Sequence, residues 1–372
     1  MEFYDCLQIN NWKQLTDDEK TEIFAAVLKF FLNPRLSLDW QRLVTFDMCG
    51  MKCRTFELML NGEVFVFIPG QKEVILGWDF GSQGLKTHEL LGEVDTIEGD
   101  QQKYGTSLTF ADLAAFGKSV DNEEEYDDFR YLEDIDRYIN QRTSSLRKVD
   151  IPPMIVAKRS QPVGTNLRGS YNLVSGNFVG DLAFFDQCQD EIYRTFNPEL
   201  SLADSLTWTY PVSVLQTDHF YLTQRWEDSD SYHLYDHSDC NYGELWLSLH
   251  RAGFQLLSED AWEFAVGGGT RRLFRWGNEV RLDNDHPFDS ALKKMRGENM
   301  FGLVQSDELT HYELTDNSDL VKLDMRSTKG CHLIEQILPF SSYYQSNHQV
   351  KINEKLDPRF YHYRKGIIID PN

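Results

Sequence analysis

The stretch GFQLLSEDAWEFAVGGGTRRLFRWGN, residues 253–278, decides the fold. Ser258 is a good helix N-cap, because its hydroxyl can accept an amide hydrogen of the first helical turn. Two acidic residues follow it, where the helix dipole favours negative charge. An apolar face then extends to Val266, and three consecutive glycines end the helix. After this turn, residues 273–276 predict a short buried strand.

The order of residues in this stretch resembles the signature of the formylglycine-generating enzyme family, the sulfatase-modifying-factor domain. The family pattern is Arg-Leu-Pro-Thr-Glu-x-Glu-Trp-Glu-Tyr-Ala-x-x-Gly-Gly, followed by Tyr-Pro-Trp-Gly-Asn or Trp-Gly-Asp. The matching positions are Leu256, Ser258 in the Thr place, Glu259, Trp262, Glu263, Phe264 in the Tyr place, Ala265, Gly268, Gly269, Trp276, Gly277 and Asn278. The resemblance implies an α+β protein with the C-type-lectin-like core of that family, built from short mixed strands, flanking helices and long loops.

Further matches extend the resemblance over about residues 46–369, and it is strong only at 253–278 and 299–303. The runs IPGQ at 68–71 and ILGW at 75–78 are similar to the family's Ile-Pro-Gly-Gly and Phe-x-Met-Gly. The run NMFGL at 299–303 is similar to its Asn-x-Phe-Gly-Leu. The family domain is therefore expected to begin near residue 46.

The domain organisation follows from this start. Residues 1–45 are expected to form an amino-terminal helical extension, because Thr16 and Glu19 form a capping box ahead of an apolar stripe at helical spacing. Residues 46–372 would form the family domain. An acidic helical insertion at about 99–148 interrupts it, and its run NEEEYDD is typical of a solvated face.

Local patterns predict further elements inside the family domain. Asn61-Gly62 between two β-rich runs is a strong hairpin signal. The other expected elements are a strand at 154–157, short strands and turns over 164–190, two strands within 206–222, and a helix at 242–251 closed by Gly253.

Composition excludes several classes of partner. The formal net charge is −22, from 59 acidic and 37 basic residues, so phosphate backbones and anionic bilayers should be repelled. The amino terminus has no basic start followed by an apolar core, and no apolar run approaches the roughly 18 residues of a membrane span. Six cysteines spread over 372 residues are typical of reduced thiols. We expect a soluble, cytoplasmic protein that binds neither nucleic acid nor membranes.

The residues that give the family its chemistry are missing. Formylglycine-generating enzymes bind copper with a pair of cysteines near the carboxyl terminus, and soft thiolates suit monovalent copper. The corresponding stretch here, STKGCHLIEQILPFSSYYQ, contains Cys331, and no second cysteine follows it. The family's calcium-binding turn, expected after Leu303, is replaced by QSDELTH. The chain is therefore expected to be a pseudoenzyme without a cofactor.

One constellation supports an alternative, metal-dependent function. His233, His237 and Asp239 form a His-x3-His-x-Asp pattern, and two imidazoles with a carboxylate suit non-haem iron. Related sulfoxide synthases carry a similar His-x3-His-x-Glu motif in a separate helical domain. Here the flanks EDSDSY and SDCNYG resemble loops, so we expect two partly exposed, unligated loop histidines. The alternative is an iron-dependent oxidase or a sulfoxide-synthase-like enzyme.

Two thiol patterns are weaker. Cys331 and His332 could form a thiol–imidazole pair, but adjacent residues of a strand point to opposite faces. Cys49 and Cys53 lack the second pair of ligands that a zinc site needs, so both are expected to be buried thiols.

The sequence thus favours a non-catalytic binding or scaffolding protein whose partner is a protein or a small molecule. It leaves iron and calcium open as ligands.

Overall fold

The computed structural model describes residues 2–85, 129, 131–197, 214–225, 228–277, 293–306, 311–324 and 332–370. These residues form helices and several largely antiparallel sheets, so the chain is an α+β protein. They divide into two compact units. Unit 1 draws on Met1–Val94, Asp127–Val163 and Cys240–Asn372, and the described part of unit 2 lies within Gly164–Asp239.

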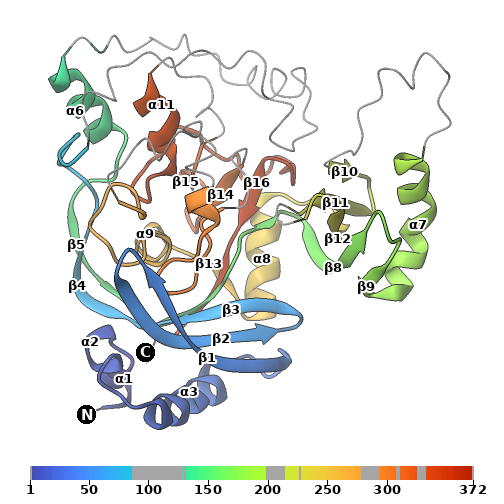
Figure 1. Cartoon of the computed structure of the whole chain (residues 1–372), viewed down its shortest axis with the longest axis horizontal. Coiled ribbons are helices and arrows are strands. Elements are labelled where there is room, and N and C mark those ends of the chain that lie inside the picture. Colours follow the sequence, from blue (N-terminus) through green and yellow to red (C-terminus); the bar gives the residue numbers. More distant parts are fainter. Residues whose placement is uncertain are drawn as a thin grey trace. The chain divides into compact units, whose positions relative to one another are not determined.

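A six-stranded antiparallel sheet in the order β1-β2-β3-β6-β17-β13 forms the base of unit 1 (Figure 1). Its strands are β1 (Leu38–Met48), β2 (Met51–Leu60), β3 (Glu63–Ile68), β6 (Met154–Ala157), β17 (Lys365–Ile368) and β13 (Gln255–Leu256). The strand predicted at 154–157 is confirmed as β6. All four of its residues are buried, whereas β1, at the margin of the sheet, is mostly exposed.

Two tight turns shape this sheet. Asn61 and Gly62 have φ values of 50° and 80°, which a two-residue hairpin turn requires, and they join β2 to β3 as predicted. Cys49 and Gly50, with φ values of 53° and 83°, join β1 to β2 in the same way. This second hairpin was not expected. The predicted domain boundary at residue 45 therefore lies inside β1.

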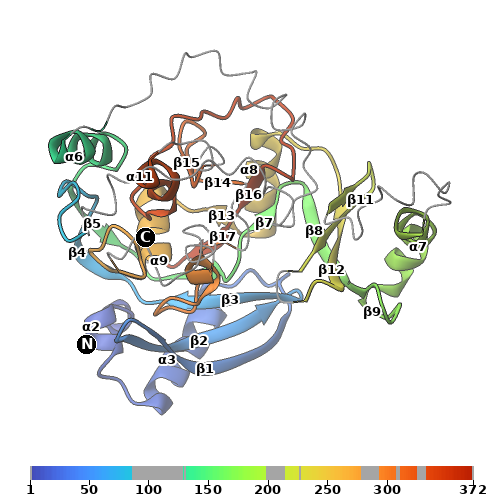
Figure 2. The ribbon, with the colours of Figure 1, turned by 45° about the horizontal axis from the view of Figure 1, so that its top comes forward.

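Three helices precede the sheet: α1 (Phe3–Cys6), α2 (Ile9–Trp12) and α3 (Asp17–Phe31). The capping box is confirmed, since Thr16 and Glu19 bond each other's amides. Phe24 of α3 stacks on Phe56 of β2 with ring centroids 4.2 Å apart. The apolar stripe of α3 therefore packs on one face of the sheet (Figure 2).

The rest of unit 1 consists of short elements joined by long loops. A four-stranded sheet in the order β15-β14-β16-β7 and the pair β4–β5 accompany the main sheet. The elements are β4 (Gln71–Leu76), α6 (Leu132–Gln141), β5 (Arg147–Ile151), β7 (Gln161–Pro162), α8 (Tyr242–Ala252), α9 (Glu259–Gly267), β14 (Tyr312–Leu314), β15 (Val321–Lys322), α11 (Leu333–Ile337), the 3-10 helix η4 (Leu338–Phe340) and β16 (Tyr361–Tyr363). Helix α8 confirms the helix predicted at 242–251, and Gly253 closes it in the left-handed conformation.

Helix α9 is the helix predicted from the signature stretch. Ser258 accepts the Ala261 amide at 3.2 Å, and Gly268 ends the helix with a φ of 66°. The strand predicted at 273–276 is wrong, because the described chain turns there and makes only an isolated bridge between Phe274 and Gly277. A side chain of this same segment, that of Arg275, instead bonds the carbonyls around it.

The described part of unit 2 is a five-stranded antiparallel sheet with one helix against it. Its order is β10-β11-β12-β8-β9, from β8 (Thr165–Asn172), β9 (Phe178–Gly180), β10 (Val214–Gln216), β11 (Phe220–Gln224) and β12 (Ser231–His237). Helix α7 (Leu182–Phe196) packs Phe185 and Ile192 against Tyr232 and Leu234 of β12. The expectation of strands and turns over 164–190 is wrong from residue 182 onward, where Asp181 caps this helix. Two strands were expected within 206–222: β10 lies in this range, and β11 begins in it and extends two residues beyond it.

The acidic insertion lies mostly outside the described residues, including its run at 122–128. Its described end is α6, a helix as expected of this insertion, in which Ile135 and Ile139 are buried. Among the helices of the described residues, none has the length and apolar character needed to span a bilayer.

Replacement of Trp262 by Ala should destabilise unit 1. The indole is fully buried on α9, so its removal leaves a large cavity and should cost roughly 3–5 kcal/mol. Urea denaturation followed by circular dichroism measures this cost. A soluble variant with an unchanged midpoint would contradict the assignment of α9 to the core, whereas Trp246→Ala, on an exposed position of α8, serves as the control.

Candidate functional site

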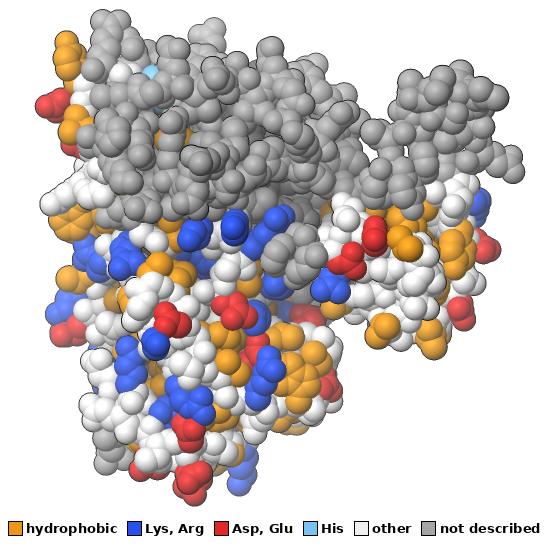
Figure 3. Space-filling model, in the orientation of Figure 1, with side chains coloured by type: hydrophobic (Ala, Val, Ile, Leu, Met, Phe, Trp, Pro, Cys, Tyr) orange, Lys and Arg blue, Asp and Glu red, His pale blue; other side chains and the backbone are white. Residues whose placement is uncertain are grey.

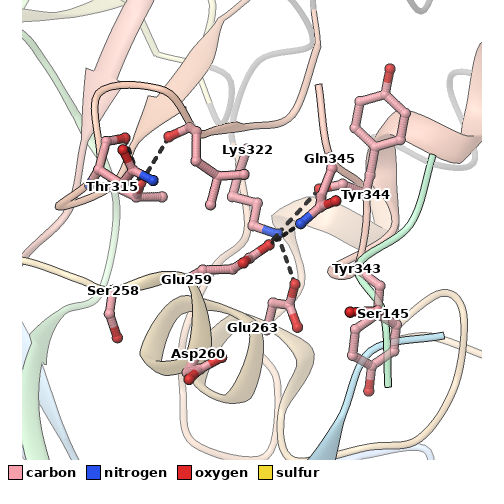
Figure 4. A network of polar contacts seen from close by, with 12 residues as sticks. Ser145, Ser258, Glu259, Asp260, Glu263, Thr315, Lys322, Tyr343, Tyr344 and Gln345 are labelled. Atoms are coloured by element: carbon pink, nitrogen blue, oxygen red, sulfur yellow. Dashed lines mark hydrogen bonds and ion pairs between the residues drawn. The ribbon is translucent and has the colours of Figure 1, made fainter. Parts of the chain in front are cut away.

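A network of charged groups surrounds the first turns of α9 and is the candidate site (Figure 4). Three acidic side chains, Glu259, Asp260 and Glu263, lie on the helix. Lys322 reaches them from β15, and Arg147 reaches them from β5. The network therefore joins three elements that are far apart in the sequence.

The Lys322 ammonium is fully buried and has three acceptors. Its Nζ lies 3.0 Å from Glu259 Oε1, 2.8 Å from Glu263 Oε1 and 3.2 Å from the carbonyl oxygen of Tyr344. An ammonium has three N–H donors, so these contacts can use all of them. Gln345 also donates to Glu259 Oε1 at 2.8 Å, which orders that carboxylate further.

Arg147 completes the network with a forked contact. Its Nε donates to Asp260 Oδ1 at 2.6 Å, and its Nη2 donates to Glu263 Oε2 at 2.9 Å. The two oxygens of Glu263 thus bind two different cations, one on each. Such charge-assisted bonds are the strong class of hydrogen bond.

The pKa values follow from burial and from these partners. Burial raises the pKa of Glu263, and the opposing fields of Lys322 and Arg147 do not cancel this effect. Burial also acts upward on Glu259, but Lys322 and the Gln345 hydrogen bond outweigh it, so the pKa of Glu259 is lowered. The carboxylates raise the pKa of Arg147 despite its own burial. Every charge of the network is thus tied to an internal partner.

A second buried ion pair lies in the same unit. Arg364 donates through Nε to Glu313 Oε1 at 2.8 Å, and both side chains are fully buried. The guanidinium also donates to the carbonyls of Lys158 at 2.9 Å and Val304 at 3.0 Å. This arginine therefore holds two loops as well as a carboxylate.

Arg275 and Asn299 hold the loop that carries the NMFGL run. Arg275 donates to the carbonyls of Met295 at 2.7 Å and Leu303 at 3.1 Å, and burial beside Arg364 lowers its pKa to about 9. Asn299 donates to the carbonyl of Ala265 in α9 at 2.7 Å. The side-chain Oδ1 of Asn299 accepts a hydrogen bond from the Leu303 amide at 3.0 Å. These motif residues have structural roles.

A third polar cluster gathers hydroxyl groups around Asp324. Its carboxylate accepts from Ser346 at 2.8 Å, from Tyr344 at 3.2 Å and from Tyr312 at 3.3 Å. The Tyr312 ring stacks on His348 with centroids 4.2 Å apart. Tyr344 belongs to both networks, because its carbonyl binds Lys322.

Two histidines stack in the interior near Arg364. The rings of His311 and His362 lie 3.8 Å apart with an interplanar angle of 10°. His311 Nε2 is 3.2 Å from the Ser306 hydroxyl. Burial, together with the charge of Arg364, lowers the pKa of His362 to about 3 and holds the pKa of His311 well below its usual range. Both rings are therefore neutral near pH 7.

The predicted His-x3-His-x-Asp pattern lies on a strand, so the expectation of loop histidines is wrong. His233 and His237 belong to β12, and Asp239 follows its end. The His237 ring is buried, against expectation, and its Nδ1 lies 2.7 Å from the Thr217 carbonyl oxygen. The apolar residues of β12 face α7, and this alternation was obscured by the polar flanks. Within the described residues, no three His, Cys, Asp or Glu side chains are grouped closely enough to hold a metal ion.

The predictions for the cysteine residues are confirmed only in part. Cys331 lies outside the described residues, and His332 is the residue that precedes α11, with its amide bonded to Glu335. Cys53 is buried as expected, and burial raises its pKa to about 11. The expectation is wrong for Cys49, which is exposed because it occupies the β1–β2 turn.

Comparison with known proteins bears on unit 2. Residues 166–236 match the family described as a profilin-like domain of unknown function (DUF7278). These residues run from β8 to β12, so the matched segment coincides with the sheet and helix of unit 2. The sequence matches no curated protein.

Replacement of Lys322 by Met should strongly destabilise the protein. It leaves Glu263 and Glu259 without their shared cation, and breaking a buried pair in this way costs roughly 3–5 kcal/mol. Because the pKa of Glu263 is raised in the folded state, its protonation at lower pH should shrink the deficit. Denaturant titrations at pH 7 and pH 5 measure both effects.

Lys351→Met is the matched control, because Lys351 forms an exposed pair with Glu354, and it should change the free energy of unfolding by less than about 1 kcal/mol. Equal effects of the two replacements would contradict the structural role of Lys322.

The stacked histidines should make the fold sensitive to acid. In the unfolded chain each histidine titrates near about 6.5, whereas the folded pKa values are lower. The unfolded state therefore binds more protons below pH 6.5, and stability should fall by about 1.4 kcal/mol per pH unit for each histidine. Unfolding free energies between pH 6.5 and 5 give this slope. His362→Gln should reduce it, and His250→Gln, on the exposed face of α8, should not.

Proposed function

We propose that this chain is a non-catalytic binding or scaffolding protein, and that unit 1 has the C-type-lectin-like core of the formylglycine-generating enzyme type. The observation that carries the proposal is the saturation of the charges around α9. The three acceptors of Lys322 and the two cations of Glu263 all belong to the protein itself. Because the hydrogen bonds of these groups are already used within the protein, they favour a non-catalytic scaffold.

The cysteine inventory supports the same conclusion. A copper site of the family's kind needs two thiolates in its carboxyl-terminal segment, and no cysteine follows Cys331. Cys188 and Cys53 are buried with raised pKa values, so they are poor nucleophiles at neutral pH.

Unit 2 is the part we propose for partner binding. Its described part lies in the chain between Val163 and Cys240 and is similar to a profilin-like domain. Three apolar side chains at its β8–β9 hairpin and at the start of α7 are largely exposed, namely Val174, Val179 and Leu182. We propose that these side chains contribute to a protein-binding surface. The partner we propose is therefore a protein, with a small-molecule ligand as the alternative.

The geometry of the two histidines on β12 favours the metal-dependent alternative less than it favours the non-catalytic proposal. An iron site would need the rings of His233 and His237 to converge with a carboxylate. Nδ1 of His237 instead contacts a backbone carbonyl, and His233 Nδ1 lies 3.4 Å from the Ser170 hydroxyl.

The purified protein should not bind copper stoichiometrically, nor oxidise a sulfatase peptide that contains cysteine. Elemental analysis after reconstitution with monovalent copper and dialysis against a chelator, together with mass spectrometry of the peptide, tests both points. Cys331→Ser is the matched variant. Tight copper binding that this variant abolishes would overturn the non-catalytic assignment, as would peptide oxidation.

A further inference from the structure

The outer edge of β1 is an open row of backbone hydrogen-bonding groups. β1 is the first strand in the order of the six-stranded sheet, and its ladder partner is β2. Figures 1 and 2 show it as the outermost strand. Eleven residues, Leu38–Met48, form this edge, which is long for an edge strand.

The hairpin geometry shows which groups face outward. Cys49 and Gly50 form a two-residue turn, so the flanking pair, Met48 and Met51, exchanges hydrogen bonds. In an antiparallel ladder such pairs alternate with pairs that are not hydrogen-bonded. The even-numbered residues 40–48 therefore bond β2, and the amides and carbonyls of 41, 43, 45 and 47 point away from it. In the described chain, none of these four has a backbone partner on the outer side.

The middle of this edge has few of the features that protect edge strands. Native edges are usually short, or carry lysines, prolines or bulges. β1 has a register shift only at its beginning, between Leu38 and Trp40, and its acidic residues Asp39 and Asp47 lie near its two ends. Arg42 stacks on Trp40 and is paired with the buried Glu57. Residues 43–46, LVTF, are free of charge.

We propose that a second copy of this chain docks on this edge, with the two β1 strands antiparallel and Val44 on the twofold axis. In this register residue 41 faces 47 of the partner subunit and residue 43 faces 45, so all four outward positions are used. Each of these pairs would exchange two hydrogen bonds. The two six-stranded sheets then form one continuous sheet. This inference concerns unit 1 and does not depend on the proposed function.

Charge and the number of paired positions together select this register among the symmetric ones. An axis at Thr45 or Phe46 places no like charges opposite each other, but it sets residue 41 beyond the end of the partner strand and uses fewer outward positions. A twofold axis at Arg42 would place two arginines opposite each other, and an axis at Leu43 would place Asp39 opposite Asp47 twice. Like charges directly opposite are destabilising in a sheet. With the axis at Val44, no like charges face each other across the seam.

The net charge of the whole chain opposes association of two copies, so the effect of salt on the dimer can test the proposal. Two copies with a net charge of −22 repel each other, although the surface around β1–β3 carries basic, acidic and apolar side chains side by side (Figure 3). Salt screens this repulsion and leaves backbone hydrogen bonds in place. The dimer should therefore become tighter between about 0.05 M and about 0.5 M NaCl, whereas a dimer held by surface ion pairs would become weaker.

The first experiment places proline at an outward amide. Thr45→Pro removes an N–H that β2 does not use, and proline is tolerated at such edge positions, so the internal ladder stays paired. Sedimentation equilibrium of the full chain should show a concentration-dependent dimer, and Thr45→Pro should raise its dissociation constant at least about tenfold. Thr45→Val, which keeps the amide, is the control. A monomer at all concentrations up to the solubility limit overturns the proposal, as does a dimer that Thr45→Pro does not weaken.

The second experiment tests the register and does not depend on proline being tolerated. In the proposed dimer the two Val44 positions form a non-hydrogen-bonded pair with Cα atoms about 4.5 Å apart, within disulfide range. In a Cys49→Ser background, Val44→Cys should give a disulfide-linked dimer on mild oxidation. Thr45→Cys should not, because its symmetry mate lies two residues out of register and beyond the reach of about 7 Å. Equal cross-linking of both variants, or none with Val44→Cys, overturns the register and with it the proposal.

Discussion

The burial of α9 with charge on it is the constraint on which unit 1 depends. Helix α9 has no solvent-facing stripe after its first turn, so Glu263 is buried beside Trp262. An isolated carboxylate in that position would become neutral or would unfold the helix. Lys322 and Arg147 offset part of this cost, and they come from β15 and β5. The ion pairs of α9 therefore hold two strands that are distant from it in the sequence.

Buried arginines extend the same principle to the loops. A fold with long loops and short strands leaves many backbone carbonyls without a ladder partner, and these need donors. Arg275 and Arg364 supply them, since each guanidinium is a rigid fork of five N–H groups. The loop around Leu303 is held from both sides in this way. Buried arginines thus hold loops of unit 1 that lie outside its helices and sheets.

This arrangement explains which parts of the fold the sequence predicts. The caps of α9 and the Asn61-Gly62 turn were predictable because their chemistry lies within a few residues. The Cys49-Gly50 turn was missed because cysteine is not a typical turn residue, although its φ is positive here. The partners of Glu263 are more than fifty residues away, so no local pattern indicates them; the only signal was a glutamate within an apolar helix face. For the same reason the segment of β12 was expected to be a loop, because its apolar residues pack against α7, which lies elsewhere in the sequence.

The two units hold themselves together by different means, and this difference restricts where recognition can occur. The described core of unit 2 is apolar and aromatic, formed between α7 and one face of its sheet. Unit 1 also buries charged side chains, and the ion pairs that Lys322 forms with Glu263 and Arg364 forms with Glu313 lie within the unit. A group whose hydrogen bonds are all internal can bind a ligand only by first giving up a partner, which costs several kcal/mol in a buried pair. The two binding surfaces that we propose therefore use groups whose bonding is incomplete within the described residues, namely the outward backbone of β1 and the exposed apolar side chains of unit 2.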